Sequence, residues 1–239
     1  MAPSSTERSH PVYIGNELEL FELAHNWKRY VASRIRPFVH GDVLEVGAGL
    51  GANVPYYHRD DLHRYVSLEP DERLCAEYRL RQRDGRIPAR CELVAGTLAT
   101  LPASALFDAI LYIDVIEHIE NDRSEFLRAF DRLRPGGALI VLCPAHNALF
   151  SPFDASIGHF RRYNRRMFRA LHDHAPARLE YLDSVGMAAS LANRILLRQG
   201  YPTREQILLW DRVMVPLSRL FDAVTLRRVG KSIMGIWRT

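Results

Sequence analysis

Three glycines and one carboxylate in the segment LEVGAGLGAN, residues 44–53, have the spacing of a nucleotide-binding turn. Gly47, Gly49 and Gly51 follow a short apolar run, and glycine at such a turn lets the main chain adopt unusual angles and approach a ligand closely. Glu69 ends the next apolar run, 22 residues after Gly47. A carboxylate at that position can accept hydrogen bonds from both hydroxyls of a ribose.

Two cofactors fit this turn as far as its glycines are concerned. Gly47, Gly49 and Ala52 satisfy the G-x-G-x-x-G/A pattern of dinucleotide sites. Glu45, two residues before the first glycine, opposes that choice because a carboxylate repels an anionic pyrophosphate. S-adenosylmethionine carries an ammonium and a sulfonium group, so Glu45 favours this cofactor, either directly or by ordering the loop. The alternative is that Glu45 only bonds local backbone.

Three histidines are candidates for a catalytic base. His118 follows the apolar run 107–113, and the near-neutral pKa of an imidazole suits general-base work. The alternative for His118 is structural, in which the Glu-His pair caps the turn and orders Asp114. His146 and His159 lie further along the chain and are equally open candidates. No arrangement of residues supports covalent nucleophilic catalysis.

The segment GHFRRYNRR, residues 158–166, holds four arginines within nine residues. We expect His159 and one of Arg161 or Arg162 to face an acceptor pocket, where an arginine fork would match a carboxylate or phosphate. Asp154 is a possible internal partner for that arginine. The competing interpretation is a buried Arg–Asp pair that only fixes the loop. The later arginines of the segment fall in the first turns of a predicted helix and are expected to point to solvent or nearby carboxylates.

The elements that must position these side chains alternate along the chain. Short apolar runs predict strands, and amphipathic stretches predict helices between them. The strands are expected at 42–46, 64–69, 91–95, 107–113 and 138–143, and the helices at 71–83 and 122–133. This alternation predicts an α/β fold with a parallel, doubly wound sheet.

Helical and strand patterns also flank this core. Before the core they predict a helix at 17–36, closed by Pro37. After the core they predict a loop of about 20 residues following Pro144, then a helix capped by Asn164 and a strand at 178–184. Helices at 186–198 and 204–224, the second kinked at Pro216, and a last strand at 231–237 complete the chain. We expect a single domain, 1–239. It comprises an N-terminal lid helix (1–37), a cofactor-binding core (38–145), a substrate-side loop and helical insertion (146–230) and a last strand (231–239).

Composition narrows the class of protein further. With 239 residues and 47% hydrophobic side chains, the chain can bury a full core, and its net charge of +4 is small for a nucleic-acid binder. No apolar run reaches the roughly 18 residues that would span a membrane. The three cysteines, Cys75, Cys91 and Cys143, are far apart and suggest buried free thiols in a reducing cytoplasm. No short-spaced cluster of histidines and cysteines suggests a metal site.

Four segments together resemble class I S-adenosylmethionine-dependent methyltransferases, in the bacterial small-molecule subgroup. They are VLEVGAGLG, YVSLEPD, FDAILYIDVIEHIEND and LRPGGALIVLCPA, in the order and spacing of that family. The resemblance covers about residues 40–145 strongly and implies a Rossmann-like, seven-stranded sheet whose last strand is antiparallel. It also implies S-adenosyl-L-methionine as cofactor and S-adenosyl-L-homocysteine as product.

Site residues follow from the resemblance position by position. The cofactor-binding positions are Glu45, Gly47, Ala48, Gly49, Asn53, Glu69, Pro70, Gly96, Thr97, Leu98, Ile113, Asp114, Val115 and His118. Thr97 stands where related enzymes often have an aspartate for the adenine amino group, so a hydroxyl or a backbone carbonyl would have to replace that contact.

The extra length of the chain is expected to roof a small-molecule pocket. The proposed substrate-side residues, which include an aromatic lid, are Trp27, Tyr30, Phe150, Phe153, Asp154, His159, Arg161, Arg162 and Tyr163. The segment YIDVIEH lacks the Asn/Asp-Pro-Pro-aromatic signature of enzymes that methylate nitrogen in macromolecules. We therefore expect methyl transfer to a small, possibly anionic acceptor in bacterial specialised metabolism, with O-methylation slightly favoured over N- or C-methylation.

Two other functions stay open. One is an RNA or ribosome methyltransferase that uses the arginines for phosphates. The other is a non-catalytic adenosyl-binding or membrane-associated protein that uses the helix at 204–224 as an interaction face. That helix is more simply explained by packing on its own domain or in a homodimer.

Overall fold

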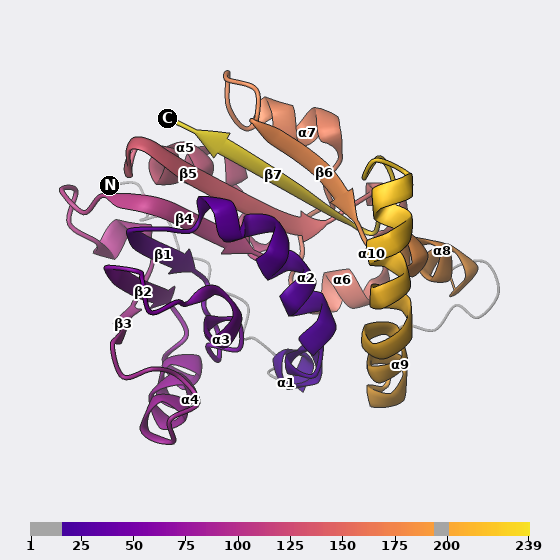
Figure 1. The fold of residues 1–239 in the computed structure, drawn as a ribbon, viewed down its shortest axis with the longest axis horizontal. Coiled ribbons are helices and arrows are strands. Elements are labelled where there is room, and N and C mark those ends of the chain that lie inside the picture. The colour runs from indigo at the N-terminus through magenta and orange to yellow at the C-terminus, as the bar shows by residue number, and fades with distance from the viewer. Residues whose placement is uncertain (1–15, 194–200) are drawn as a thin grey trace, which may run out of the picture.

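The fold is built on a single seven-stranded sheet. The computed structural model describes residues 16–193 and 201–239. The strands lie in the order β3-β2-β1-β4-β5-β7-β6, and β7 runs antiparallel to both of its neighbours (Figure 1). The strands are β1 (Asp42–Val46), β2 (Arg64–Glu69), β3 (Cys91–Ala95), β4 (Phe107–Ile113), β5 (Leu133–Pro144), β6 (Arg178–Leu182) and β7 (Ser232–Arg238). This Rossmann-like order and the antiparallel last strand confirm the predicted fold class.

Helices cover both faces of the sheet, so its central strands are buried on both sides. Along β4, Ala109, Leu111 and Ile113 join one apolar cluster, and Ile110 and Tyr112 join the other. The helices are α1 (Asn16–Glu22), α2 (His25–Ile35), α3 (Val54–Tyr57), α4 (Glu72–Arg83), α5 (Asp122–Phe130), α6 (Pro152–Ser156), α7 (Arg165–Ala170), α8 (Ser184–Ala192), α9 (Arg204–Leu209) and α10 (Val215–Val224). Helices α2 and α3 supply one cluster, and α5 and α7 supply the other.

The predicted helix at 17–36 is two helices, α1 and α2, in the part that the structure describes. The break falls at Leu23 and Ala24. The ammonium of Lys28 donates to the carbonyl oxygens of Phe21 and Glu22, at 2.6 and 3.3 Å. These carbonyls end α1, and Lys28 adds to the single bond that the Phe21 carbonyl accepts from the amide of Ala24 at 3.1 Å, so Lys28 stabilises the break.

The boundary between α5 and β5 also differs from the prediction. The helix expected to reach residue 133 ends at Phe130, and β5 begins at Leu133 rather than at Ala138. The amide of Phe107 donates to the carbonyl of Arg132 at 2.9 Å, so pairing with β4 replaces the last helical turn. The RPGG segment then forms an irregularity inside β5, where the register against β4 shifts.

The C-terminal helical region is more divided than the sequence predicts. The stretch 204–224 forms α9, a π-helical turn at Trp210–Met214, and α10, with Pro216 in the first turn of α10. Proline has no N–H to continue the hydrogen-bond ladder, which accounts for the break just before it. The long loop after Pro144 contains α6. The helix expected at 186–198 is α8, and positions 194–198 of that expectation lie outside the described residues.

Three buried carboxylates attach the C-terminal helices to the sheet and to α2. Asp222 accepts hydrogen bonds from the amides of Asp183 and Ser184 and from the hydroxyl of Tyr30, at 2.8, 2.9 and 2.9 Å. Asp211 accepts from two amides in the first turn of α2, where the N-cap residue offers no side-chain hydrogen bond. The third, Asp183, accepts from the indole of Trp210 and the hydroxyl of Ser218.

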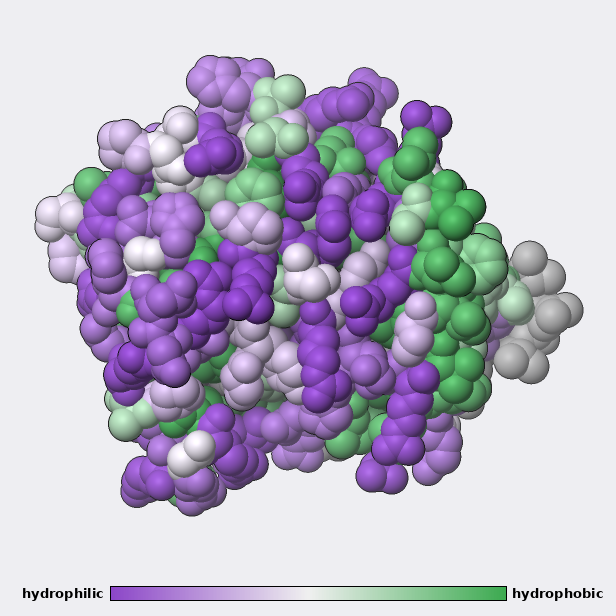
Figure 2. Space-filling model, viewed as in Figure 1, coloured by the Kyte–Doolittle hydropathy of each residue, from purple (hydrophilic) through white to green (hydrophobic). Residues whose placement is uncertain are grey.

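One face of the C-terminal helices stays apolar and exposed. Figure 2 shows apolar side chains gathered over α9 and α10. The exposed apolar residues there are Leu209, Val213, Leu217, Leu220, Phe221 and Val224. Within the described ranges, no helix is both long enough and apolar enough to cross a membrane. Cys75, Cys91 and Cys143 are buried free thiols, as the sequence predicts.

Replacing Asp222 with alanine should lower the free energy of unfolding by about 3 kcal/mol, because two amides and a tyrosine hydroxyl would lose a buried partner. Urea unfolding followed by circular dichroism measures this change. Asp173→Ala is the matched control, because the Asp173 side chain is exposed. Equal stability of the two variants would contradict this role of Asp222.

Candidate active site

The glycine turn after β1 is attached to the end of β2 by hydrogen bonds. The carboxylate of Glu69 accepts from the amide of Gly49 at 2.8 Å and from the amide of Asp71 at 2.9 Å. The amides of Gly47 and Ala48 both donate to the carbonyl of Leu68, at 2.8 and 3.1 Å. The two segments that the sequence predicts to hold a nucleoside therefore form one unit at the carboxyl edge of the sheet.

Glycine is required in this turn for two reasons. Gly47, Gly49 and Gly51 have φ angles of 67°, 56° and 73°, a region that residues with a side chain rarely adopt. A Cβ on Gly47 would lie 2.6 Å from the side chain of Val115, which follows β4. Leu18 of α1 packs against Gly49, because a Cβ built on Gly49 would lie 3.6 Å from the Leu18 side chain. The turn is thus enclosed between β4 and α1.

Glu45 lies beneath the turn and is fully buried. Its carboxyl group accepts a hydrogen bond from the Asn53 side chain at 3.1 Å and from the Tyr65 hydroxyl at 2.8 Å. Burial raises the pKa of Glu45 to about 7, although both hydrogen bonds oppose the shift. Because Asn53 directly precedes α3, Glu45 orders the loop, which is one of the two roles that the sequence left open.

The predicted adenine-side residues follow β2 and β3. The amide of Gly96 donates to the carbonyl of Glu69 at 2.8 Å, which places the two strand ends side by side. Thr97 and Pro70 are exposed, whereas Leu98 is buried. The carbonyl of Thr97 accepts from the hydroxyl of Thr100 at 2.7 Å. An exposed Thr97 keeps its side chain accessible at this edge.

Asp114 follows β4 and has a left-handed backbone with φ of 55°. Its amide donates to the carbonyl of Leu142 at 2.8 Å, and the residue is exposed on one side. The protein packed around its other sides still desolvates the carboxyl group and raises the pKa of Asp114 to about 6, while His159, Lys28 and Lys231 oppose the shift. These three groups come from distant parts of the chain, so Asp114 marks the point where α2, the long loop and the start of β7 converge.

Sequence analysis missed both lysines near Asp114. Lys28 is buried in α2, and burial lowers its pKa to about 8. Burial also lowers the pKa of Lys231, which lies 5.7 Å from the ring centroid of Trp210. The sequence did hold a signal for Lys28, since it falls on the apolar face of a predicted helix. Lysine is seldom buried without a partner, so its position there indicates a specific role. Lys231 carries no comparable pattern.

His118 and His159 lie together although 41 positions separate them. Their ring centroids are 4.5 Å apart. Burial and the neighbouring His159 lower the pKa of His118 to about 3, against hydrogen bonds to the backbone of Gly158 and Ile157. His118 therefore fastens the long loop to the turn after β4, which favours the structural interpretation over a strong base. His159 in turn contacts Asp154 at 3.0 Å.

Comparison with known proteins identifies the central part of the chain. Residues 44–141 match the family model described as a methyltransferase domain. A probable S-adenosylmethionine-dependent methyltransferase of Mycolicibacterium smegmatis is 34% identical over 112 residues, which are 46% of this chain and 40% of that relative. Residues 44–141 are therefore similar to a methyltransferase domain, and the matching relative is described as S-adenosylmethionine-dependent. Because the match spans less than half of the curated relative, it does not assign that protein's whole activity to this chain.

Solved structures show the same fold over most of the chain. Coclaurine N-methyltransferase, bound to N-methylheliamine and S-adenosylhomocysteine, has a TM-score of 0.60 and 13% identity, covering 98% of this chain and 76% of that one. The cyclase SpnF has a TM-score of 0.59 and 13% identity, covering 88% of this chain and 81% of that one. At this identity the likeness concerns the fold alone.

The arginines of the long loop have internal partners. Arg162 is buried and donates to both oxygens of Asp154, at 2.8 Å each. Arg161 pairs with Asp122 at 2.7 Å. The structure therefore shows the second of the two interpretations, acid–arginine pairs that fix the loop, instead of an arginine fork open to an acceptor. Arg162 Nη1 is the one atom of this fork that has no hydrogen-bond partner among the described residues.

The predicted aromatic lid is only partly a lid. Trp27 and Tyr30 are buried core residues, and Tyr163 is fully buried with its hydroxyl on Asp122 at 2.7 Å. Phe153 does meet the N-terminal segment, because its ring centroid is 6.5 Å from that of Phe21. The ring centroid of Phe21 is also 6.4 Å from that of Trp210. The sequence did not identify Trp210 as a site residue. Phe150 is half-buried.

His146 takes partners outside the pair of histidines. Its Nε2 lies 3.0 Å from the carbonyl oxygen of Gly230, and its ring stacks on Tyr181 with centroids 4.8 Å apart. The structure thus brings two of the three predicted catalytic histidines together and leaves His146 at the junction of β5 and β6.

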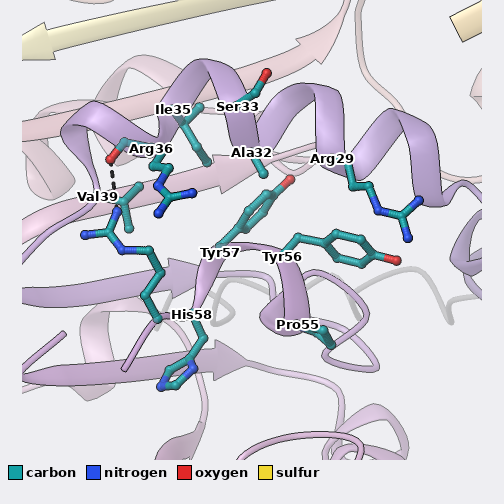
Figure 3. A pocket seen from close by; sticks show the side chains of 11 residues that line it. Arg29, Ala32, Ser33, Ile35, Arg36, Val39, Pro55, Tyr56, Tyr57 and His58 are labelled. Atoms are coloured by element: carbon teal, nitrogen blue, oxygen red, sulfur yellow. Dashed lines mark hydrogen bonds between the residues drawn. The ribbon is translucent and has the colours of Figure 1, made fainter. Parts of the chain in front are cut away.

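A cavity of about 640 Å³ lies between α2 and α3, on the outer side of the glycine turn (Figure 3). Its lining residues are Arg29, Ala32, Ser33, Ile35, Arg36, Val39, Pro55, Tyr56, Tyr57, His58 and Arg59. The carbonyl of Arg36 accepts from Arg59 across its rim at 3.2 Å. None of the predicted cofactor residues lines this cavity, so it is separate from the edge formed by Glu69 and Asp114.

The raised pKa of Glu45 makes the stability of the domain depend on pH. The folded chain keeps a proton on Glu45 that the unfolded chain releases above its ordinary pKa of 4.5. This contribution is fully present below pH 4.5 and is lost as the pH rises through 7. Glu45→Gln removes the titration, so the stability of the variant relative to the wild type should rise by up to about 3 kcal/mol across this window.

Urea unfolding at several pH values between 4.5 and 7.5 measures this difference. Glu92→Gln is the control, because Arg64 lowers the pKa of the Glu92 carboxyl and gives the opposite sign. A stability difference between Glu45→Gln and the wild type that stays constant with pH would contradict the buried titration.

Proposed function

We propose that this chain binds S-adenosylmethionine at the carboxyl edge of the sheet and transfers its methyl group to a small-molecule acceptor. The observation that carries the proposal is the contact between the Glu69 carboxylate and the amide of Gly49, at 2.8 Å. It joins a ribose-binding acid to a glycine turn at the point where the strand order reverses, between β1 and β4. The family match of residues 44–141 supports the same cofactor.

The roles of the cofactor-side residues follow from their places at this edge. Glu69 retains lone pairs for the ribose hydroxyls, because each carboxylate oxygen accepts only one hydrogen bond from the protein. Gly47, Ala48 and Gly49 present main chain to the methionine part, and Asp114 closes the methyl side. Ile113 and Val115 flank Asp114 on the same strand end. Pro70, Gly96, Thr97 and Leu98 surround the adenine.

Charge favours a cationic cofactor over a dinucleotide. Glu45, Glu69 and Asp114 surround the turn, and burial raises the pKa of each carboxyl group. A ligand with positive charge stabilises the ionised forms of such acids, whereas a pyrophosphate would add to the repulsion. The sulfonium and ammonium of S-adenosylmethionine meet this requirement.

Methyl transfer from a sulfonium is an in-line displacement, so positioning the acceptor supplies much of the acceleration. Phe21, Phe153 and Trp210 form an apolar wall from α1, α6 and the π-helical turn, which suits a small acceptor with an apolar body. We favour O-methylation over N- or C-methylation, and a role in bacterial specialised metabolism. His118, with a pKa of about 3, is too weak a base to drive the reaction alone.

The arginine pairs weigh against an RNA substrate. A phosphate-binding surface needs unpaired cations along a stripe, and Arg161 and Arg162 are both occupied by internal acids. A non-catalytic, membrane-associated protein would use α10 as its contact. The catalytic proposal is preferred because the cofactor-side residues converge at one edge.

Glu69→Gln should weaken binding of S-adenosylmethionine and S-adenosylhomocysteine by about 10- to 100-fold, the effect of a loss of roughly 1–3 kcal/mol at a buried polar contact. Isothermal titration calorimetry measures the affinity and should give one site per chain for the wild type. Glu72→Gln, three positions along on the exposed surface, is the control. Binding of NAD without binding of either adenosyl compound would overturn the proposed cofactor.

We further propose a homodimer through the exposed apolar face of α10. Leu220 and Val224 are 63% and 72% exposed, far more than is usual for adjacent large apolar side chains of a monomer. Analytical ultracentrifugation should show a dimer for the wild type and a monomer for the double variant Leu220→Glu, Val224→Glu. Leu80→Glu, on the exposed side of α4, is the control and should stay dimeric. A monomeric wild type would contradict the proposal.

A further inference from the structure

Two histidines and a glutamate converge beside Asp114, at the end of β4. Glu117 and His118 belong to the 3-10 turn Ile116–His118, and His159 comes from the loop before α7. One potential ligand atom from each of the three side chains lies within 4.8 Å of the other two. The Oε1 atom of Glu117 is 3.8 Å from Nε2 of His159, which is too far for a hydrogen bond between them.

Glu117 is the unusual member of this cluster. Its side chain is fully buried, and neither carboxylate oxygen has a hydrogen-bond partner among the described residues. A buried carboxylate without partners is costly unless a cation or a proton compensates it. Two imidazoles lie within 4.8 Å of this carboxylate, and imidazole is a common metal ligand. The carboxylate is therefore placed as a ligand of a bound cation would be.

Asp154 orients the ring of His159 from the side opposite Glu117. The Nδ1 atom of His159 lies 3.0 Å from Oδ1 of Asp154, which fixes the ring and leaves Nε2 toward Glu117. Asp154 is in turn held by two hydrogen bonds from Arg162. A carboxylate that orients a histidine in this way is the usual outer partner of a metal-binding imidazole. His118 is likewise oriented by backbone groups of Ile157 and Gly158.

We propose that Glu117, His118 and His159 bind a divalent transition-metal ion, with Zn²⁺ the ion that fits the donor set best. Two imidazole nitrogens and one carboxylate oxygen are typical of a zinc site with an open coordination position, whereas Mg²⁺ and Ca²⁺ prefer oxygen ligands throughout. Zinc bonds of roughly 2 Å put tetrahedral ligand atoms about 3.4 Å apart. The three side chains, whose ligand atoms lie within 4.8 Å of one another, would therefore move closer together by up to about 1.4 Å. The competing explanation is that Glu117 holds a proton and no ion binds.

The chemical role of the ion rests on the proposed function. The cluster begins three residues after Asp114, so an acceptor hydroxyl on the ion would lie near the methyl side of the cofactor. Coordination would release the hydroxyl proton to water. The acceptor oxygen would then form a bond to the methyl carbon while the carbon–sulfur bond breaks, and that electron pair would stay on sulfur as a neutral thioether. A metal ion would thereby supply the activation that His118 cannot.

The test is Zn²⁺ binding by the folded full chain, freed of metal with a chelator. Calorimetry with a competing chelator should give one tight site per chain, and Glu117→Gln and His159→Ala should each weaken it at least 100-fold. His174→Ala is the matched control, because the exposed His174 lies beside the half-buried His172 and this pair would bind zinc adventitiously. No zinc binding by the wild type, or loss only in His174→Ala, would overturn the proposal.

A second measurement uses the unaltered chain and stays informative if a variant fails to fold. The absorption spectrum of the Co²⁺-loaded protein, together with X-ray absorption at the zinc edge, should show two imidazole ligands and one carboxylate. A spectrum of a fully hydrated ion would overturn the site. Binding of S-adenosylhomocysteine to the metal-free chain is measured in parallel, so that failure of the metal site and failure of the proposed cofactor are separate results.

Discussion

The carboxylate of Asp154 holds the interactions on which the long loop after β5 depends. Burial opposes its charge, yet hydrogen bonds from His159, Arg162 and Ser151 outweigh burial and lower the pKa of Asp154. The same carboxylate caps α6 and fixes the ring of His159. One buried acid thus determines the path of the long loop and which side chains that loop presents to Glu117.

A second constraint is the balance of charge around Asp114. The carboxylates of Asp114 and Glu117 are close enough to repel each other. Among the described residues, His159, Lys28 and Lys231 lower the pKa of Asp114 and so favour its charged form. The Lys28 ammonium also donates hydrogen bonds to the last carbonyls of α1, the helix that covers the glycine turn. The same ammonium group supplies one of the charges that act on Asp114. Closure of α1 over the site and the electrostatics of the site are therefore coupled through Lys28.

The sequence predicts the strands around the glycine turn well because its signals there are local. The glycines, Glu45 and Glu69 lie within or next to short strands whose apolar runs identify them, and all five central strands were placed. The substrate half depends on long-range pairing. The sequence names Asp154 as a possible partner for Arg161 or Arg162, but the segment GHFRRYNRR does not decide that Arg162 takes it or that Arg161 meets Asp122. The spacing between Glu117 and His159 does not resemble a metal motif. The kink near Pro216 is predicted from the proline itself, whereas the break between α1 and α2 at Leu23 and Ala24 is not, because the contact of Lys28 with the end of α1 stabilises it.

The arginine pairs change what the acceptor should look like. If Arg161 and Arg162 were free, an anionic acceptor would be held by a guanidinium fork. With both neutralised, the cations left near Asp114 are the ammonium groups of Lys28 and Lys231, whose pKa values burial lowers. Burial makes such ammonium groups easier to deprotonate than exposed lysines. Under the proposed function, an adjacent cation would stabilise most an acceptor oxygen that gains its charge only during the reaction.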